Sequence, residues 1–442
     1  MRFKIYILQF FVCIFIMVSC KTKQVTYEMP MEPVTEIEVE KVVEEPSVND
    51  QKTTGFKLGI EVLQQIDFAA LKGKRVGLVT NPTGVDRNLK STLDILHESK
   101  NVNLVALFGP EHGVRGNFSA GDEVNNQTDE KTGLPVFSLY GKDKKPNREA
   151  MDLVDVMIYD IQDIGVRSYT YISTMGLVME AAADYNKEVI ILDRPNPLGC
   201  EKVEGPLVHD GFYSFVSQFK IPYVYGLTCG ELARLLNFEG LLANGKKCQL
   251  QVIPMQGYSR EMDFDATGLH WVPTSPHIPN SQTAYYYATT GILGELNPTL
   301  IGIGYTLPFQ SLVTETIDAD QLANAMNALN LAGVIFRPTY YKPYYKEMQG
   351  KELQGVQIHI TDFKKVNLTE IQFFFLQEAH KIEPKFNPFN GNENRYRMFD
   401  MGCGTDSIRL SMMKDFNFEK VRTIWNGECQ NFKELSRKYY LY

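Results

Sequence analysis

The sequence predicts an α/β protein built on a doubly wound parallel sheet, and three observations support this. Five short apolar runs recur along the first half of the chain without strict alternation, as in strands that are buried on both faces. Stretches with apolar residues at helical spacing lie between some of these runs. Most of the runs end directly in a polar or glycine- and proline-rich turn. Alternating strands and helices are typical of a doubly wound sheet.

The elements follow in chain order. The predicted strands are 75–80, 103–108, 135–139, 155–160 and 188–193. Apolar residues at helical spacing predict helices over 89–99 and 174–185. A further helical stretch, 228–242, opens with Thr228-Cys229-Gly230-Glu231, which has the pattern of a capping box.

The first 20 residues have the pattern of an export signal. Arg2 and Lys4 precede an apolar run over 5–18 that is too short to span a bilayer comfortably. The run ends in Met17-Val18-Ser19-Cys20, which resembles the lipobox of bacterial lipoproteins. We expect residues 1–19 to be a signal peptide and Cys20 to carry the lipid, which places an exported bacterial lipoprotein in the cell envelope, periplasmic or on the surface. Plain secretion with cleavage nearby is the alternative.

Residues 20–55 are predicted to form a disordered acidic tether. The segment is rich in acids, contains prolines and lacks a helical apolar stripe. It cannot bury enough apolar surface to offset the conformational entropy of an ordered chain. The folded part of the protein is therefore expected to begin at residue 56.

Composition excludes two classes of protein. The chain carries 45 Lys and Arg against 53 Asp and Glu, a formal net charge of −8, whereas nucleic-acid binding needs a concentrated basic surface. Its 7 cysteines show no CxxC pair, so neither a disulfide framework nor a thiolate zinc site is expected.

Polar residues follow the predicted strands where ligands bind in open α/β sheets, beyond the carboxyl ends of the strands. We expect these side chains to converge on one rim: Asn81, Glu111, His112, Asp160, Asp163, Arg167, Asp193 and Arg194. Paired carboxylates suit general acid/base catalysis of the cleavage of a glycosidic bond. An arginine suits an anionic substrate group, and Tyr169 and Tyr171 could stack on a sugar. Alternatively, the aspartates cap helices and Arg167 neutralises them.

Other catalytic motifs are absent from the sequence. It has no G-x-S-x-G elbow, no HExxH and no complete G-x-G-x-x-G. We therefore expect no nicotinamide cofactor and no metal. A metal held by Glu111, His112 and a nearby aspartate is the alternative, and it predicts inhibition by chelators.

Three motifs together resemble the exo-lytic β-N-acetylmuramidases, long known as a domain of unknown function. The motifs are GPEHGVRG at 109–116, YDIQDIGVRSYTY at 159–171 and DRPNPLG at 193–199. The resemblance implies a Rossmann-like catalytic domain, 56–215, and a smaller C-terminal α/β domain, 216–442, with the active site in the cleft between them. It also implies removal of N-acetylmuramic acid from the non-reducing end of peptidoglycan fragments, without a cofactor.

The resemblance makes Glu111 the leading catalytic candidate, and it implies site roles for His112, Asp160, Asp163 and Arg167. The second half matches less closely. Relatives often have a histidine where this chain has Tyr225, and His277 stands where asparagine is common. Further substrate-binding candidates are Tyr171, Asn81, Asp193, Arg194, Trp271 and Glu295, although the large aromatic residues can equally serve packing.

The resulting hypothesis gives each group a role. Glu111 protonates the bridging oxygen, and Asp160 or Asp163 attacks, activates water or orients the substrate. The substrate's own 2-acetamido group is an alternative nucleophile. Arg167 or Arg194 pairs with the lactyl carboxylate that distinguishes muramic acid. A tethered, non-catalytic module that binds peptidoglycan fragments is the competing hypothesis. Neither hypothesis involves nucleic acid, and both give the protein membrane contact through the lipid anchor only.

Overall fold

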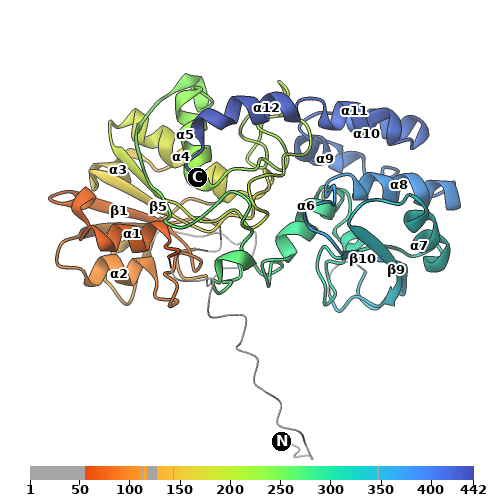
Figure 1. Ribbon diagram of the computed structural model, residues 1–442, viewed down its shortest axis with the longest axis horizontal. Helices are drawn as coiled ribbons and strands as arrows, with labels where there is room; N and C mark the ends of the chain where they lie inside the picture. Colours follow the sequence, from red (N-terminus) through yellow and green to blue (C-terminus); the bar gives the residue numbers. More distant parts are fainter. Residues whose placement is uncertain (1–54, 112, 117–126, 143, 346–347) are drawn as a thin grey trace, which may run out of the picture. The chain divides into compact units, whose positions relative to one another are not determined.

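The computed structural model describes residues 55–442 except 112, 117–126, 143 and 346–347 (Figure 1). Four predicted features therefore lie outside the described residues: the signal peptide, Cys20, nearly all of the tether, and His112. Within the described ranges, no helix is long and apolar enough to cross a membrane.

The larger sheet has seven strands in the order β3-β4-β2-β1-β5-β6-β7. Every neighbouring pair is parallel except β3 with β4. The strands are β1 Arg75–Thr80, β2 Asn103–Gly109, β3 Gln127–Thr128, β4 Pro135–Ser138, β5 Val156–Asp160, β6 Glu188–Leu192 and β7 Gln249–Ile253. The five predicted strands are all present, within a residue at each end. The sheet continues past residue 215, the expected boundary, because β7 pairs with β6.

Helices cover both faces of this sheet (Figure 1). One face carries α1 Gly59–Gln65 and α2 Thr92–Glu98, and the other carries α3 Arg148–Asp152, α4 Tyr171–Asp184 and α5 Cys229–Phe238. Successive residues of β1 point to opposite faces of the sheet. Val76 and Leu78 pack in the hydrophobic cluster under α1 and α2, whereas Val79 packs in the cluster under α3, α4 and α5. The predicted doubly wound sheet is confirmed.

The predicted capping box at the start of α5 is also confirmed. The Thr228 hydroxyl accepts a hydrogen bond from the Glu231 amide at 3.2 Å, and the Thr228 amide donates to the Glu231 carboxylate at 3.2 Å. These two bonds satisfy amide groups that the first turn of a helix leaves free. The helix ends at Phe238, four residues before the predicted end.

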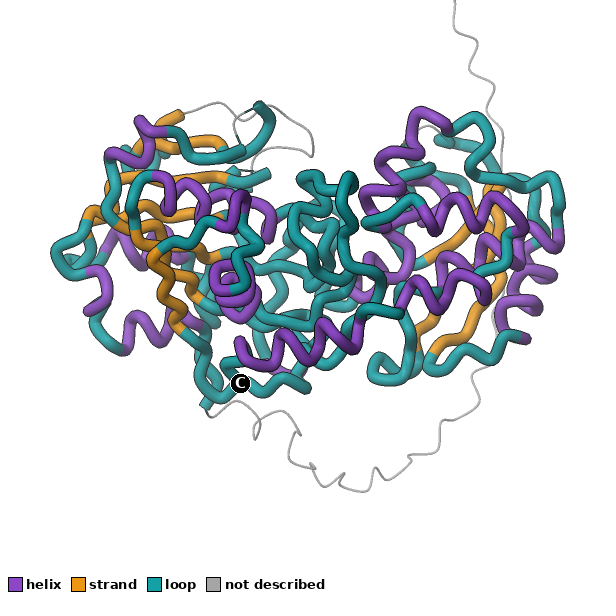
Figure 2. Tube along the Cα trace, turned by 90° about the horizontal axis from the view of Figure 1, so that it is seen from above, coloured by secondary structure: helices purple, strands orange, loops and turns teal. Residues whose placement is uncertain are grey.

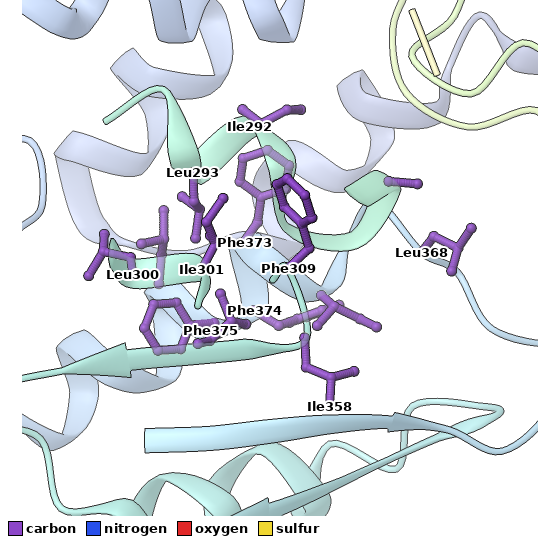
Figure 3. Close-up of a cluster of buried hydrophobic side chains, with 14 of the residues drawn as sticks. Ile292, Leu293, Leu300, Ile301, Phe309, Ile358, Leu368, Phe373, Phe374 and Phe375 are labelled. Carbon is purple, nitrogen blue, oxygen red and sulfur yellow. The ribbon is translucent and has the colours of Figure 1, made fainter. Parts of the chain in front are cut away.

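A smaller antiparallel sheet of three strands, in the order β8-β10-β9, lies in the second half of the chain. Figure 2 shows both sheets with their flanking helices. The elements here are β8 Ser311–Thr314, β9 Val334–Tyr341, β10 Leu353–Ile360, α6 Thr283–Gly294, α7 Ala319–Ala328 and α8 Ile371–Ile382. Side chains of α6, α8 and β10 meet in a phenylalanine-rich core (Figure 3). This confirms the expected second, smaller α/β domain.

The last helices are α9 Tyr396–Cys403, α10 Ser407–Asp415, α11 Glu419–Asn426 and α12 Cys429–Ser436. After them the chain returns to the larger sheet, where the Tyr442 hydroxyl donates to Asp193 Oδ2 at 2.6 Å. Residues 216–442 therefore contribute both to the smaller domain and to the layers around the larger sheet.

Candidate active site

A cavity of about 250 Å³ lies at the carboxyl end of the parallel sheet. Its lining residues come from five segments: Glu111; Ser168, Tyr169, Thr170 and Tyr171; Ser275, Pro276, His277 and Ile278; Tyr287; and Phe309. Among the described residues of this lining, Glu111 is the one acid. The cavity thus combines a single carboxylate with several aromatic rings and hydroxyl groups.

Glu111 reaches the cavity from the turn that follows β2. The Gly113 amide donates to the Pro110 carbonyl at 2.9 Å, and Gly113 has φ +75°, which favours glycine. The half-buried Glu111 carboxylate accepts a long hydrogen bond, 3.3 Å, from the Thr170 hydroxyl. Burial, together with the charge of Glu111, raises the pKa of Tyr140 to about 12.

The aromatic residues hold one another in place. The rings of Tyr169 and Tyr171 meet edge to face with centroids 5.0 Å apart, and Tyr169 meets Tyr287 in the same way at 5.7 Å. The hydroxyls of Tyr169 and Tyr171 donate to Thr274, to Oγ1 at 2.8 Å and to the carbonyl at 2.5 Å. Burial raises the pKa of Tyr171 and Tyr287, so both remain neutral hydroxyls at physiological pH.

Phe309 joins the cavity to the phenylalanine-rich core of the smaller domain (Figure 3). Its φ of +67° is unusual for a bulky side chain. Two hydrogen bonds hold this conformation: the Phe309 amide donates to the Ile301 carbonyl at 2.8 Å, and the Thr290 hydroxyl donates to the Phe309 carbonyl at 3.0 Å. Backbone strain of this kind persists where the surrounding structure fixes it.

Asp160 and Arg194, both expected at the rim, are buried against each other instead of lining the cavity. Arg194 Nε donates to Asp160 Oδ1 at 2.5 Å and Nη2 donates to Oδ2 at 2.9 Å. The Thr92 hydroxyl donates to the same carboxylate, and Arg194 also donates to the Val85 carbonyl at 2.8 Å. The ion pair ties the end of β5 to the end of β6.

Asp163 lies in the same buried layer. Its Oδ2 atom accepts hydrogen bonds from the Tyr225 hydroxyl and from the Gly165 amide, the latter at 2.7 Å. Oδ1 is buried and has no hydrogen-bond partner within the part of the chain that the structure describes. Burial raises the pKa of Asp163 to about 7, although the hydrogen bonds from Tyr225 and Gly165 act in the opposite direction. Tyr225 therefore binds this carboxylate.

Arg167 is almost fully buried and binds main-chain oxygens. Its guanidinium donates to the carbonyls of Pro206 and Ile221, both at 2.7 Å, and of Gly402 at 2.9 Å. Burial lowers the pKa of Arg167 to about 10. These contacts join three segments that are far apart in the sequence, and they do not bring the guanidinium to the cavity lining.

Asn81 and Asp193 are also buried below the rim. Asn81 Oδ1 accepts from the amide and hydroxyl of Thr83, at 2.9 and 2.6 Å, while its Nδ2 has no hydrogen-bond partner among the described residues. Asp193 accepts from the Thr228 hydroxyl at 2.7 Å and the Gly230 amide at 2.8 Å. Burial raises the pKa of Asp193 to about 6.

Trp271 and Glu295 lie near the cavity without lining it. The Trp271 indole donates to the Ile278 carbonyl at 3.1 Å and so supports the 275–278 segment. Glu295 lies 3.6 Å from the Arg395 guanidinium, and burial raises the pKa of Glu295. Of the predicted site residues that the structure describes, Glu111 and Tyr171 share the cavity.

Several lining residues were not predicted as site residues. Phe309 carries no sequence pattern that distinguishes it from a packing residue. Tyr287 is the last residue of a tyrosine run at 285–287, and His277 stands where asparagine is common in the resembled family. The polar and aromatic composition of 271–278 was the available signal for this wall of the cavity.

A doubly wound sheet with a carboxylate in a tyrosine-lined cavity at its carboxyl edge is consistent with an α/β glycosidase. The family models described as exo-beta-N-acetylmuramidase NamZ, N-terminal and C-terminal, match residues 76–282 and 285–442. The chain therefore belongs to the exo-β-N-acetylmuramidase NamZ family, which is a family of glycosidases, and the resemblance seen in its three motifs is confirmed.

Individual relatives agree with this placement. The chain is 40% identical over 391 residues to the peptidoglycan beta-N-acetylmuramidase NamZ of Bacillus subtilis (strain 168), covering 88% of this chain and 92% of that protein. Two crystal structures of DUF1343 family proteins from Bacteroides fragilis NCTC 9343 are also similar. One is 54% identical with a TM-score of 0.84, and the other is 30% identical with a TM-score of 0.69. Each comparison covers 88% of this chain and 99% of the other.

Proposed function

We propose that this protein is an exo-acting glycoside hydrolase that releases N-acetylmuramic acid from the non-reducing end of peptidoglycan fragments. The observation that carries the proposal is the position of Glu111 in the tyrosine-lined cavity. Aromatic rings offer apolar faces to a sugar ring, and the surrounding hydroxyls offer hydrogen bonds to its polar edge. A cavity of about 250 Å³ suits one terminal sugar unit rather than an extended glycan.

In the proposed reaction, Glu111 donates its proton to the bridging oxygen as the bond from this oxygen to the anomeric carbon breaks. The rest of the fragment leaves with a free hydroxyl. A water molecule then supplies the hydroxyl group of the released sugar, and its remaining proton returns to the Glu111 carboxylate. The Thr170 hydroxyl, 3.3 Å from Glu111 Oε2, orients the carboxyl group.

In this proposal the nucleophile is the substrate's own 2-acetamido group. Asp160 and Asp163 are buried and do not line the cavity. Asp160 is already engaged by Arg194, and Asp163 by Tyr225. An acetamido oxygen that attacks the anomeric carbon replaces a nucleophilic carboxylate, as in substrate-assisted glycosidases. Asp160 and Asp163 then act as positioning residues beneath the site.

The decisive experiment uses residues 51–442, whose described part belongs to one compact unit. Chromophore release from an aryl β-N-acetylmuraminide is compared with release from the matching β-N-acetylglucosaminide. We expect cleavage of the first substrate and loss of this activity in Glu111→Gln. The exposed Glu130→Gln is the matched control and should keep full activity. Binding of muramic-acid fragments without any turnover would instead favour the non-catalytic binding module.

We also propose that the protein is an exported lipoprotein held in the cell envelope through Cys20. The support is the order of a basic start, an apolar run and Met17-Val18-Ser19-Cys20. Radiolabelled palmitate should be incorporated into the wild-type chain and not into Cys20→Ala. The substituted protein should also leave the membrane fraction, whereas equal membrane retention of both proteins would contradict the proposal.

A further inference from the structure

The rings of His277 and Tyr345 are paired beside the Glu111 cavity. His277 lines the cavity, whereas Tyr345 is 41% exposed and is not part of the lining. The Nε2 atom of His277 and the hydroxyl oxygen of Tyr345 are 2.9 Å apart. The two ring centroids are 6.3 Å apart, and the ring planes differ by 9°. The pair therefore leads from the cavity lining toward solvent.

The two rings are nearly parallel and are displaced sideways from each other. The ring planes differ by 9°, and a centroid separation of 6.3 Å is too large for parallel rings to overlap face to face. The contact between Nε2 and the hydroxyl oxygen joins the rings at their edges. His277 and Tyr345 thus place two parallel aromatic rings side by side, one in the cavity lining and one beside it.

The backbone around Tyr345 is fixed from the other side. The Tyr344 amide donates to the Gly304 carbonyl at 2.7 Å. A Cβ atom at Gly304, where φ is +100°, would lie 2.6 Å from the Tyr345 carbonyl oxygen, so only glycine permits this approach. The Tyr305 ring stacks on Tyr341 with centroids 4.0 Å apart and contacts Tyr344 at 5.4 Å. The exposed Tyr345 therefore stands on a supported loop.

We propose that His277 and Tyr345 form the subsite for the sugar on the leaving side of the cleaved bond, an N-acetylated pyranose. This inference rests on the proposed function, because the bond must be cleaved beside Glu111. The terminal sugar fills the cavity, and the next ring along the fragment lies outside it. The partly exposed Tyr345 ring, parallel to His277 and beside the lining, offers that sugar ring an aromatic face for its axial C–H groups. The N-terminal family segment supplies His277 and the C-terminal one supplies Tyr345.

The test measures binding by calorimetry in the full chain carrying Glu111→Gln, solubilised in mild detergent, so that bound sugar is not hydrolysed. The ligands are the disaccharide N-acetylmuramyl-β-1,4-N-acetylglucosamine and free N-acetylmuramic acid. Adding Tyr345→Ala should weaken disaccharide binding about tenfold and leave binding of the monosaccharide within about twofold. Tyr345→Phe keeps the ring and should retain most of the affinity. Tyr340→Ala removes a 59% exposed tyrosine outside this pair and should change neither affinity.

Two results would overturn the subsite. One is unchanged disaccharide binding in Tyr345→Ala, and the other is equal weakening of both ligands, which indicates a structural role for the ring. The hydrolytic function is judged separately from turnover of the disaccharide by the wild-type protein. Absence of turnover with the binding difference intact refutes the hydrolysis alone, whereas turnover with unchanged binding refutes the subsite alone.

Discussion

Arg194 and Asp160 form a bidentate ion pair at the carboxyl end of the parallel sheet, with N–O distances of 2.5 and 2.9 Å. The Arg194 side chain is 4% exposed and the Asp160 side chain 0%. Both had been expected to contact substrate, yet each satisfies the charge of the other. A buried pair of this geometry fixes the ends of β5 and β6, and the lining segment 168–171 follows β5.

Asp160→Asn should therefore destabilise the protein by about 3–5 kcal/mol, because Arg194 would keep a buried charge without its partner. Urea unfolding at pH 7 measures this loss. The double variant Asp160→Asn/Arg194→Met removes both charges, and its loss should be smaller than the sum of the two single losses. Normal stability combined with a large fall in kcat would instead place Asp160 on the substrate.

Arg167→Met should reduce the free energy of unfolding by about 2–4 kcal/mol. Three main-chain carbonyls, at Pro206, Ile221 and Gly402, lose a charged donor. The preference for muraminide over glucosaminide should stay the same, since the guanidinium does not line the cavity. Thermal unfolding and the ratio of kcat/KM for the two substrates provide the two readouts. A collapse of that ratio in a stable variant would restore the lactyl-binding role of Arg167.

Asp163 should make stability depend on pH. Burial raises its pKa in the folded protein to about 7, while in the unfolded chain it titrates near 4. The folded state therefore binds the extra proton between these values, and its stability falls as pH rises from about 4 to about 7. The slope contributed by this group is at most about 1.4 kcal/mol per pH unit.

Asp163→Asn removes the titration with little change of shape. The stability of wild type relative to this variant should decrease between pH 5 and pH 8, as measured by urea unfolding at both values. Asp152→Asn, an exposed aspartate, is the control and should show no such trend. A pH-independent difference between wild type and Asp163→Asn would show that Asp163 is already ionised at pH 5.

The parallel sheet could be predicted from the sequence because buried strands leave a local signal, a short apolar run ended by a turn. The hydrogen-bond partners of the polar residues could not be predicted in the same way. Asp160 binds Arg194, Asp163 binds Tyr225, and Arg167 binds the Gly402 carbonyl. Each partner lies far along the chain, and whether a rim residue faces the ligand or a partner beneath it depends on that pairing.

Glu111 was predictable for the opposite reason. Its motif follows β2 directly, and the described residues place no oppositely charged side chain on its carboxylate. The wall of the cavity that comes later in the chain than Glu111, built from 275–278, Tyr287 and Phe309, could not be predicted from a motif that follows a strand. Aromatic and small polar residues occur in cores and in sugar sites alike, so only the folded arrangement distinguishes the two uses.

The role of Glu111 as the acid can be tested through the leaving group. With the natural disaccharide, whose departing alcohol needs a proton, Glu111→Gln should lower kcat about 10²–10⁴-fold. With a dinitrophenyl β-N-acetylmuraminide the departing phenolate is stable without a proton, so the loss should be less than about tenfold. Circular dichroism of the variant checks that the fold is intact. Equal losses with both substrates would assign Glu111 to binding or to attack on the anomeric carbon instead of proton donation.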